Sequence, residues 1–251
     1  MARRSPGVLA WLFALTLASC TPTPDAAPET SAPIGLNSSL PILWSESADV
    51  TTHLAPAESH WALAVLGKHG PGKKRDVRGL DSLAGPRGVA SLGPIGLLVL
   101  AQPYPLSPDD NVALDDWVRG GGRVLLFADP MLTAHSIYPL GDRRRPQDVA
   151  LLSPILSRWG VELRFDEAQS SAPRSGKIGD VTIPVRLSGT FAPVPGAGGC
   201  VIEAEALVAT CTVGKGRVVA VADAAMLDRN PAESAEFRAR ALAYLLGRLT
   251  P

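Results

Sequence analysis

Two aspartates stand where buried strands of a parallel sheet would end. Asp129 follows the apolar run RVLLFA, and Asp223 follows the similar run RVVAVA. Ligands of open α/β folds bind at the carboxyl edge of the sheet, so this pair could act as acid and base, or hold a metal, at a separation of roughly 5 to 10 Å. In the alternative interpretation, which we favour, each carboxylate caps the turn or helix start that follows it.

A second group of charged residues precedes an apolar segment that begins at Val149. Asp142 is followed by Arg143, Arg144 and Arg145. Guanidinium groups bind carboxylates and phosphates through paired hydrogen bonds, so Asp142 and Arg143 could form an anion site at the same sheet edge. A loop in which the aspartate and the arginines satisfy one another explains the pattern equally well.

Other catalytic patterns are missing from the sequence. It contains no G-x-S-x-G pentapeptide for a nucleophile elbow, and no H-x-x-x-H, H-E-x-x-H or C-x-x-C arrangement for a metal. We therefore predict no catalytic residue, no metal site and no cofactor. We expect the histidines to be solitary surface or loop residues: His53, His60, His69 and His135.

The N-terminal segment has the three parts of a secretory signal. Arg3 and Arg4 give a positive start, Val8 to Leu17 is apolar, and small residues precede Cys20. The apolar run is too short to cross a bilayer. A signal that ends in cysteine resembles the bacterial lipobox, in which the thiol is acylated and the mature chain starts at that residue. We predict lipidation of Cys20.

The expected organisation has three parts: a lipoprotein signal peptide over 1–19, a proline-rich tether over 20–33, and a single α/β domain over 34–251. The lipid would hold the chain at a bacterial membrane with the domain facing the periplasm. Thr21 in place of aspartate favours the outer membrane, by resemblance to known sorting rules. The 24 basic and 24 acidic residues balance, which argues against nucleic acid as a partner.

The two remaining cysteines are close in the chain. A two-residue hairpin at Glu205-Ala206 would place Cys200 opposite Cys211, with Cα atoms about 5.5 Å apart, within disulfide range. Glu-Ala is a poor sequence for such a turn, and two free thiols are the alternative. We expect a disulfide, because an exported domain folds in an oxidising compartment.

Short apolar runs bounded by glycine, proline and polar residues predict strands buried on both faces. These runs are 61–66, 95–101, 123–128 and 217–222. The segment 181–213 has shorter alternating runs and many turn residues, which predicts an antiparallel extension or edge.

Helix signals separate these strands. Ser107 as N-cap and Pro108 as first residue begin a helix, and the glycines at 120–122 end it. We expect its packed side to carry four residues: Val112, Leu114, Trp117 and Val118. Further helices are predicted over 149–159 and 232–249. The order strand, helix, strand predicts a right-handed crossover and a parallel sheet.

Several patches resemble the GldG-type auxiliary proteins encoded with ABC transporters, which include components associated with gliding motility. The patches lie between Leu36 and Leu246 and include SSLPILWSE, LLVLAQPYPLSPDDNVALDDWVRGGGRVLLFADP, YPLGDRRRP, LLSPILSRWGVELRF and VGKGRVVAVADAAMLD. The resemblance implies a flavodoxin-like three-layer sandwich, similar to class I glutamine amidotransferases. Asp129-Pro130 stands where such an enzyme would present its nucleophile, so the resemblance implies a sensing or scaffolding part without catalysis.

These observations favour a lipid-anchored, extracytoplasmic binding or scaffold protein. The resemblance gives it a role as an accessory to an ABC transport system, with the permease and ATPase as possible partners, or to the cell envelope. One alternative is an envelope hydrolase that uses Asp129 and Asp223. Another is a solute-binding lipoprotein, which would need a deep cleft between two lobes.

Overall fold

The computed structural model describes Met1 and residues 32–46, 59–70, 74–85, 91–197, 199–229 and 234–250. The signal peptide after Met1, the lipidation site Cys20 and the tether up to residue 31 lie outside the described residues, as does His53. Within the described ranges, no helix has the length and apolar content that a bilayer crossing requires.

A seven-stranded, mainly parallel sheet forms the centre of the domain, in the order β2-β1-β3-β4-β11-β10-β9. Its parallel strands are β2 (Val77–Gly79), β1 (Ile34–Ser38), β3 (Leu97–Ala101), β4 (Arg123–Phe127) and β11 (Gly216–Val221). Every residue of β3 is buried, and so is every residue of β4 after Arg123. Continuous apolar sequences suit strands that are covered on both faces. The predicted strands at 95–101, 123–128 and 217–222 are confirmed.

The chain reverses its direction of travel across the sheet next to β1. It leaves β1 toward β2 on one side, and then crosses to β3 on the other side of β1 before it continues to β4. The carboxyl ends of β1 and β3 therefore lead into connections that run in opposite directions. Such a reversal is the place where open α/β sheets hold ligands.

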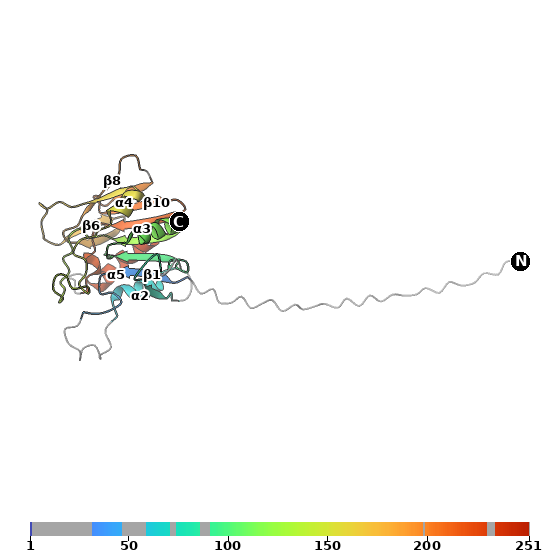
Figure 1. Ribbon diagram of the computed structural model, residues 1–251, viewed down its shortest axis with the longest axis horizontal. Coiled ribbons are helices and arrows are strands. Elements are labelled where there is room, and N and C mark those ends of the chain that lie inside the picture. The colour runs from blue at the N-terminus through green and yellow to red at the C-terminus, as the bar shows by residue number, and fades with distance from the viewer. Residues whose placement is uncertain are drawn as a thin grey trace.

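The described residues also form four α-helices and one 3₁₀ turn: α2 (Trp61–Lys68), α3 (Pro108–Arg119), α4 (Ser153–Trp159), α5 (Ala235–Gly247) and η2 (Ala225–Leu227). The helices pack in pairs, α2 on α5 and α3 on α4. Figure 1 shows α3 and α4 in the upper half of the domain and α2 and α5 in the lower half.

Helix α3 begins as predicted. The Ser107 hydroxyl oxygen accepts a hydrogen bond from the Asp110 amide at 3.1 Å, and the Asp110 carboxylate accepts one from Ser107, which is a reciprocal cap. Leu114 and Val118 are buried, but Val112 is 61 % exposed. The prediction for Val112 was wrong because residues two apart on a helix point to different sides.

The segment WALAVL is helical, which corrects the prediction of a strand at 61–66. It forms most of α2 and buries Ala62 and Leu66, one helical turn apart. His60 caps it, since its ring Nδ1 accepts a hydrogen bond from the Ala62 amide at 3.2 Å. A short continuous apolar run has no period that separates strand from helix, and its alanines favour the helix.

The other two predicted helices are shorter than expected. Helix α4 starts at Ser153 rather than at 149, with Pro154 in its first turn, because proline is tolerated there and not further inside. Gly160 ends it with φ of 99°, a conformation that glycine adopts without strain. Helix α5 starts after Ser234, whose hydroxyl accepts from the Phe237 amide.

Antiparallel strands fill the segment from 181 to 213, as predicted. Strand β9 (Cys200–Glu203) and β10 (Val208–Val213) extend the main sheet beyond β11. Two separate pairs complete the extension: β5 (Val161–Arg164) with β8 (Thr190–Pro193), and β6 (Arg174–Ile178) with β7 (Val181–Val185).

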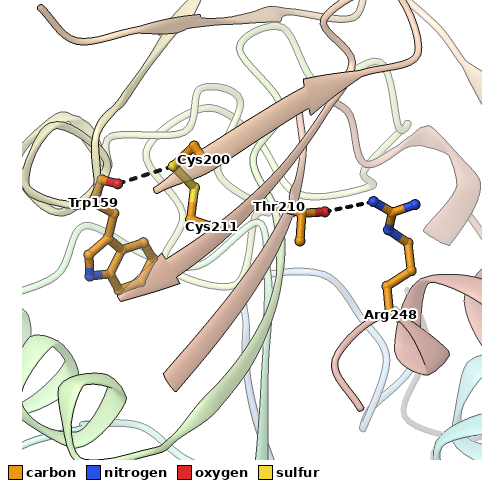
Figure 2. Close-up of a disulfide and its surroundings, with 5 residues drawn as sticks. All are labelled: Trp159, Cys200, Thr210, Cys211 and Arg248. Atoms are coloured by element: carbon orange, nitrogen blue, oxygen red, sulfur yellow. Dashed lines mark hydrogen bonds between the residues drawn. A yellow bond between two sulfur atoms is a disulfide. The ribbon is translucent and has the colours of Figure 1, made fainter. Parts of the chain in front are cut away.

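Cys200 and Cys211 are joined by a disulfide between β9 and β10, as predicted (Figure 2). The turn is centred on Glu205 and Ala206, whose φ angles of 56° and 68° are those of a primed hairpin turn in spite of the unfavourable sequence. The Cα atoms are 4.0 Å apart, closer than expected. The next residues outward carry the ladder hydrogen bond, from Thr212 N to Gly199 O, so the cysteines occupy the narrower, non-hydrogen-bonded position.

Candidate functional site

Asp129 and Asp223 occupy equivalent positions at the carboxyl edge of the sheet. Phe127 at the end of β4 pairs in register with Val221 at the end of β11, and each aspartate follows its strand by two residues. Asp129 is 0 % exposed and Asp223 is 1 % exposed. The structure therefore brings the two carboxyl groups near one another, which the sequence had left open, and places both under the surface.

Both oxygens of the Asp129 carboxylate accept hydrogen bonds from the backbone. Oδ1 accepts from the Met131 amide at 2.9 Å, and Oδ2 accepts from the Ala224 amide at 3.1 Å. The first bond closes a turn directly after β4, and the second ties that turn to the chain leaving β11. Burial nevertheless raises the pKa of Asp129 to about 6, against the lowering effect of these two amides.

Asp223 has the same arrangement. Its Oδ1 accepts from the Ala225 amide at 2.6 Å and its Oδ2 from the Arg186 amide at 2.8 Å. These bonds hold η2 and the end of β7 against β11. Burial, and after it the neighbouring charge of Asp129, raise the pKa of the Asp223 carboxyl well above its usual range.

This geometry is that of turn-capping carboxyl groups. An acid–base pair must reach its substrate within hydrogen-bond distance, whereas both of these groups are covered and each oxygen already accepts a backbone amide. Their burial removes the geometric basis for a hydrolase that uses Asp129 and Asp223. Among the described residues, no three His, Cys, Asp or Glu side chains gather in a way that could hold a metal.

Gln102, which the sequence analysis did not single out, organises this edge. It is fully buried and has a φ of 47°, a conformation that side-chain-bearing residues adopt at a cost. Its Oε1 accepts from the Asp129 amide at 2.8 Å, and its Nε2 donates to the carbonyl oxygens of Asp129 and Gln147 at 3.0 and 2.9 Å. A single glutamine after a strand carries no sequence signal for this role.

A cavity of about 690 Å³ opens at the same edge of the sheet, beside the reversal at β1. Its wall includes Ser38 at the end of β1 and Gly79 at the end of β2. Beside leucines, three aromatic residues line the rest of the wall: Trp44, Tyr104 and Tyr138. Sequence reasoning missed these residues, because they come from three separate loops that only the fold brings together.

The structure does not pair Asp142 with Arg143 in the predicted anion site. Asp142 pairs with Arg144, through bonds of 3.0 Å to Nε and 2.7 Å to Nη2, and this partner lowers the pKa of Asp142 to about 2. Arg144 also lies over the Tyr138 ring, 4.1 Å from its centre. Arg143 lines the cavity, and its guanidinium forms no ion pair with any carboxylate in the described ranges.

Among the histidines that the structure describes, His60 differs from the prediction. His60 is buried, and its Nε2 lies 3.0 Å from the Leu227 carbonyl oxygen. Because Nδ1 accepts from a backbone amide, Nε2 carries the proton and donates it. Burial lowers the pKa of His60 to about 4. This ring is a structural cap for α2, whereas His135 is exposed as expected.

No protein-family model matches the sequence, and no curated protein matches it either. Similar solved structures include the mmIFT52 N-terminal domain, at 10 % identity and a TM-score of 0.52, over 87 % of this chain and 98 % of that one. A cytoplasmic protein from Salmonella typhimurium LT2 matches at 13 % identity and a TM-score of 0.51, over 87 % and 98 % of the two chains.

One glycosidase also contains a similar domain. Gan42B, a GH42 β-galactosidase from G. stearothermophilus, is 13 % identical with a TM-score of 0.51. This chain spans 30 % of that enzyme and 35 % of the exo-β-1,4-mannosidase Op5Man5 from Opitutaceae bacterium strain TAV5. At these identities the matches with TM-scores above 0.5 show a shared α/β fold and nothing about activity.

Proposed function

We propose that this chain is a lipid-anchored, non-catalytic binding or scaffold protein of the bacterial cell envelope. Its domain faces the periplasm and serves as an accessory to an ABC transport system or to the envelope itself. The observation that carries the proposal is the contrast at the carboxyl edge. The two carboxyl groups that could do chemistry are buried and saturated, while an open cavity lies beside the reversal of the sheet.

The fold supports the finer assignment to a flavodoxin-like, three-layer sandwich. The parallel strands have the order β2-β1-β3-β4-β11, which matches the doubly wound order 2-1-3-4-5. Right-handed crossovers on the two sides of β1 put α2 and α3 on opposite faces of the sheet. The pairs α2 with α5 and α3 with α4 then form the outer layers.

The resemblance to GldG-type auxiliary proteins agrees with this assignment. The turn after β4, where an amidotransferase-like enzyme would present its nucleophile, holds Asp129 with its carboxylate turned into backbone hydrogen bonds. The disulfide between Cys200 and Cys211 supports an oxidising compartment, because such bonds are rare in the reducing cytosol.

Metabolic labelling with palmitate tests the anchor. We expect label in the wild-type chain and in the membrane fraction, and none in a Cys20→Ser variant. A Cys211→Ser variant is the matched control, since it also loses one cysteine but keeps the lipobox. An unlabelled wild-type chain in a soluble cytoplasmic pool would contradict the anchor.

Co-purification tests the accessory role. The full chain, solubilised from native membranes with a mild detergent, is expected to bring down a permease, an ATPase or another envelope component in constant ratio. Recovery of intact, labelled protein with no such component would contradict the accessory role and leave the anchor standing.

A further inference from the structure

The connection from β4 to α4, residues 128–152, is a long segment without helix or strand. We call residues 129–151 the edge loop. Two backbone hydrogen bonds join the two ends of the edge loop. The Ala150 amide donates to the Asp129 carbonyl oxygen at 2.8 Å, and the Leu132 amide donates to the Asp148 carbonyl oxygen at 2.9 Å. Long ordered loops in compact domains are uncommon and usually functional.

Hydrogen bonds to the rest of the domain fix the edge loop in place. The Gln147 amide donates to Ser39 Oγ at 3.0 Å, and Ile137 N donates to the Glu46 carboxylate at 2.8 Å. On the other side, the Tyr104 hydroxyl donates to the Arg143 carbonyl oxygen at 2.8 Å. The loop therefore presents a defined surface rather than a set of interchanging ones.

The edge loop exposes several large apolar side chains. Five large apolar side chains of the edge loop are between 41 % and 79 % exposed: Met131, Ile137, Leu140, Val149 and Leu151. Apolar residues exposed singly need no explanation, whereas five on one hydrogen-bonded segment offer apolar surface that a partner could cover. The cavity adjoins the edge loop, with Tyr138 and Arg143 of that loop in its wall.

The charges around the cavity define what could bind there. Arg144 is neutralised by Asp142, and Arg145 by Asp148. Arg143 keeps a guanidinium with no carboxylate partner among the residues that the structure describes, while Asp81 stands in the cavity wall contributed by the β2 side. A carboxylate next to apolar side chains would complement Arg143 and the edge loop, and would bind best away from Asp81.

The position of the edge loop on the sheet favours a protein partner over the anchoring membrane. The residues before β1 join the sheet at its amino edge, where Pro33 O accepts from the Gly96 amide. The edge loop leaves β4 at the carboxyl edge, and β1 and β4 both run parallel to β3 between them. The edge loop thus lies at the opposite end of the strands from Pro33, where the expected tether would join the domain.

We infer that the cavity and the edge loop together form a docking surface for an acidic, apolar segment of a partner protein. The inference rests on the proposed role as a binding protein and names the partner's chemistry. A carboxylate of the segment pairs with Arg143, and apolar side chains beside it cover the edge loop and enter the cavity against Trp44, Tyr104 and Tyr138.

A peptide array tests this docking surface with the full chain in detergent micelles. The array carries peptides with one Glu between Leu, Ile or Phe residues, each matched to a peptide with Gln in its place. We expect the acidic peptides to bind about tenfold more tightly, since one bidentate charge-assisted contact is worth about that factor. Arg143→Gln should abolish the difference, and Leu140→Ser should weaken both sets.

Asp81→Asn should strengthen the acidic peptides severalfold, because it removes the opposing charge. Two matched controls lie elsewhere on the surface: Arg240→Gln on α5 and Val112→Ser on α3, both at exposed positions. Neither should change peptide binding. Thermal unfolding confirms that the variants keep the fold, which is expected for exposed positions.

Other outcomes would overturn the inference. Equal binding of Glu and Gln peptides would show that the Arg143 guanidinium does not bind the carboxylate of the segment. A preference for Glu that survives Arg143→Gln would show the same. Displacement of the peptides by millimolar acetate or phosphate would assign the site to a small anion. Binding of the Cys20→Ser chain to phosphatidylglycerol vesicles that depends on Arg143 and Leu140 would assign the surface to a membrane. None of these results affects the palmitate labelling, so the anchor is judged separately.

Discussion

Gln102 and Asp129 are joined by two hydrogen bonds that continue the β3–β4 pairing beyond the end of the strands. The Asp129 amide donates to Gln102 Oε1 and the Gln102 amide nitrogen donates to the Asp129 carbonyl oxygen. The Gln102 side chain thus supplies the acceptor and the donor that backbone groups would supply within the sheet. The same nitrogen also reaches Gln147 O in the edge loop, so one residue couples the buried carboxyl pair to the proposed docking surface.

Removal of the Gln102 side chain is therefore expected to destabilise the domain. Gln102→Ala leaves a buried amide and two carbonyl oxygens without this partner, at a cost of about 2 to 4 kcal/mol. Gln102→Gly loses the same hydrogen bonds but relieves the positive φ, so it should be about 1 kcal/mol more stable than the alanine variant. Urea unfolding measures both. Alanine and glycine variants of equal stability would contradict backbone strain at this position.

The sequence predicted the parts of the fold that local patterns determine. Serine and proline at 107 and 108 mark the start of α3 correctly, and the runs at 95–101, 123–128 and 217–222 mark central strands. The run at 61–66 was assigned wrongly, because alternation and helical period cannot be distinguished in so short an apolar segment. Its packing on α5 adds to the helix preference of its alanines and to the His60 cap.

The site could be located from the sequence but not built from it. The positions of Asp129 and Asp223 follow from the ends of their strands, whereas the burial that gives them a structural role depends on the chain that covers them. Gln102 donates to a residue 45 positions away, and nothing in its neighbours predicts that bond. The sequence also did not predict which arginine pairs with Asp142. In the structure Asp142 pairs with Arg144, and Arg143 is exposed.

The Cys200–Cys211 disulfide is expected to stabilise the edge of the sheet. In the chain-entropy account, a link across 11 residues contributes about 2 to 3 kcal/mol. The double variant Cys200→Ser/Cys211→Ser should lose about this free energy of unfolding and become insensitive to dithiothreitol, while the wild type should lose the same amount on reduction. In the reduced wild type, the Cys200 thiol can donate to the Trp159 carbonyl oxygen, which its sulfur already faces at 3.1 Å (Figure 2). A wild type whose stability is unchanged by complete reduction would contradict the prediction.

His60 is expected to make the fold sensitive to acid. Its folded-state pKa of about 4 lies below the ordinary value of 6.5, so the unfolded chain binds more protons between these values and stability falls as the pH is lowered through them. Once the pH is low enough to protonate the histidine fully in both states, the free energy of unfolding has fallen by about 3 kcal/mol. His60→Asn keeps an acceptor for the α2 cap but does not titrate. The variant should therefore lose less stability than the wild type between pH 7 and pH 4.5 in urea unfolding, and an equal loss would show that the ring is not kept neutral.

The Asp129–Asp223 pair gives a dependence of the opposite sign. Both carboxyl groups have pKa values raised in the folded state, so the folded chain binds more protons than the unfolded chain above pH 4. Their contribution is fully present below the unfolded pKa and is lost as the pH rises through about 6, the value for Asp129.

Asp223→Asn isolates this effect, because an amide of the same shape cannot ionise. Its amide group must place a donor against Ala225 N or Arg186 N, which lowers stability at every pH. The informative quantity is therefore the difference in the free energy of unfolding between variant and wild type. This difference should move in favour of the variant as the pH rises from 4 to 8. Asp129→Asn should show the same sign, since each carboxyl raises the cost of ionising the other. A difference that stays constant over this range would mean that the two groups are not buried side by side, and with that the structural role assigned to them would fail.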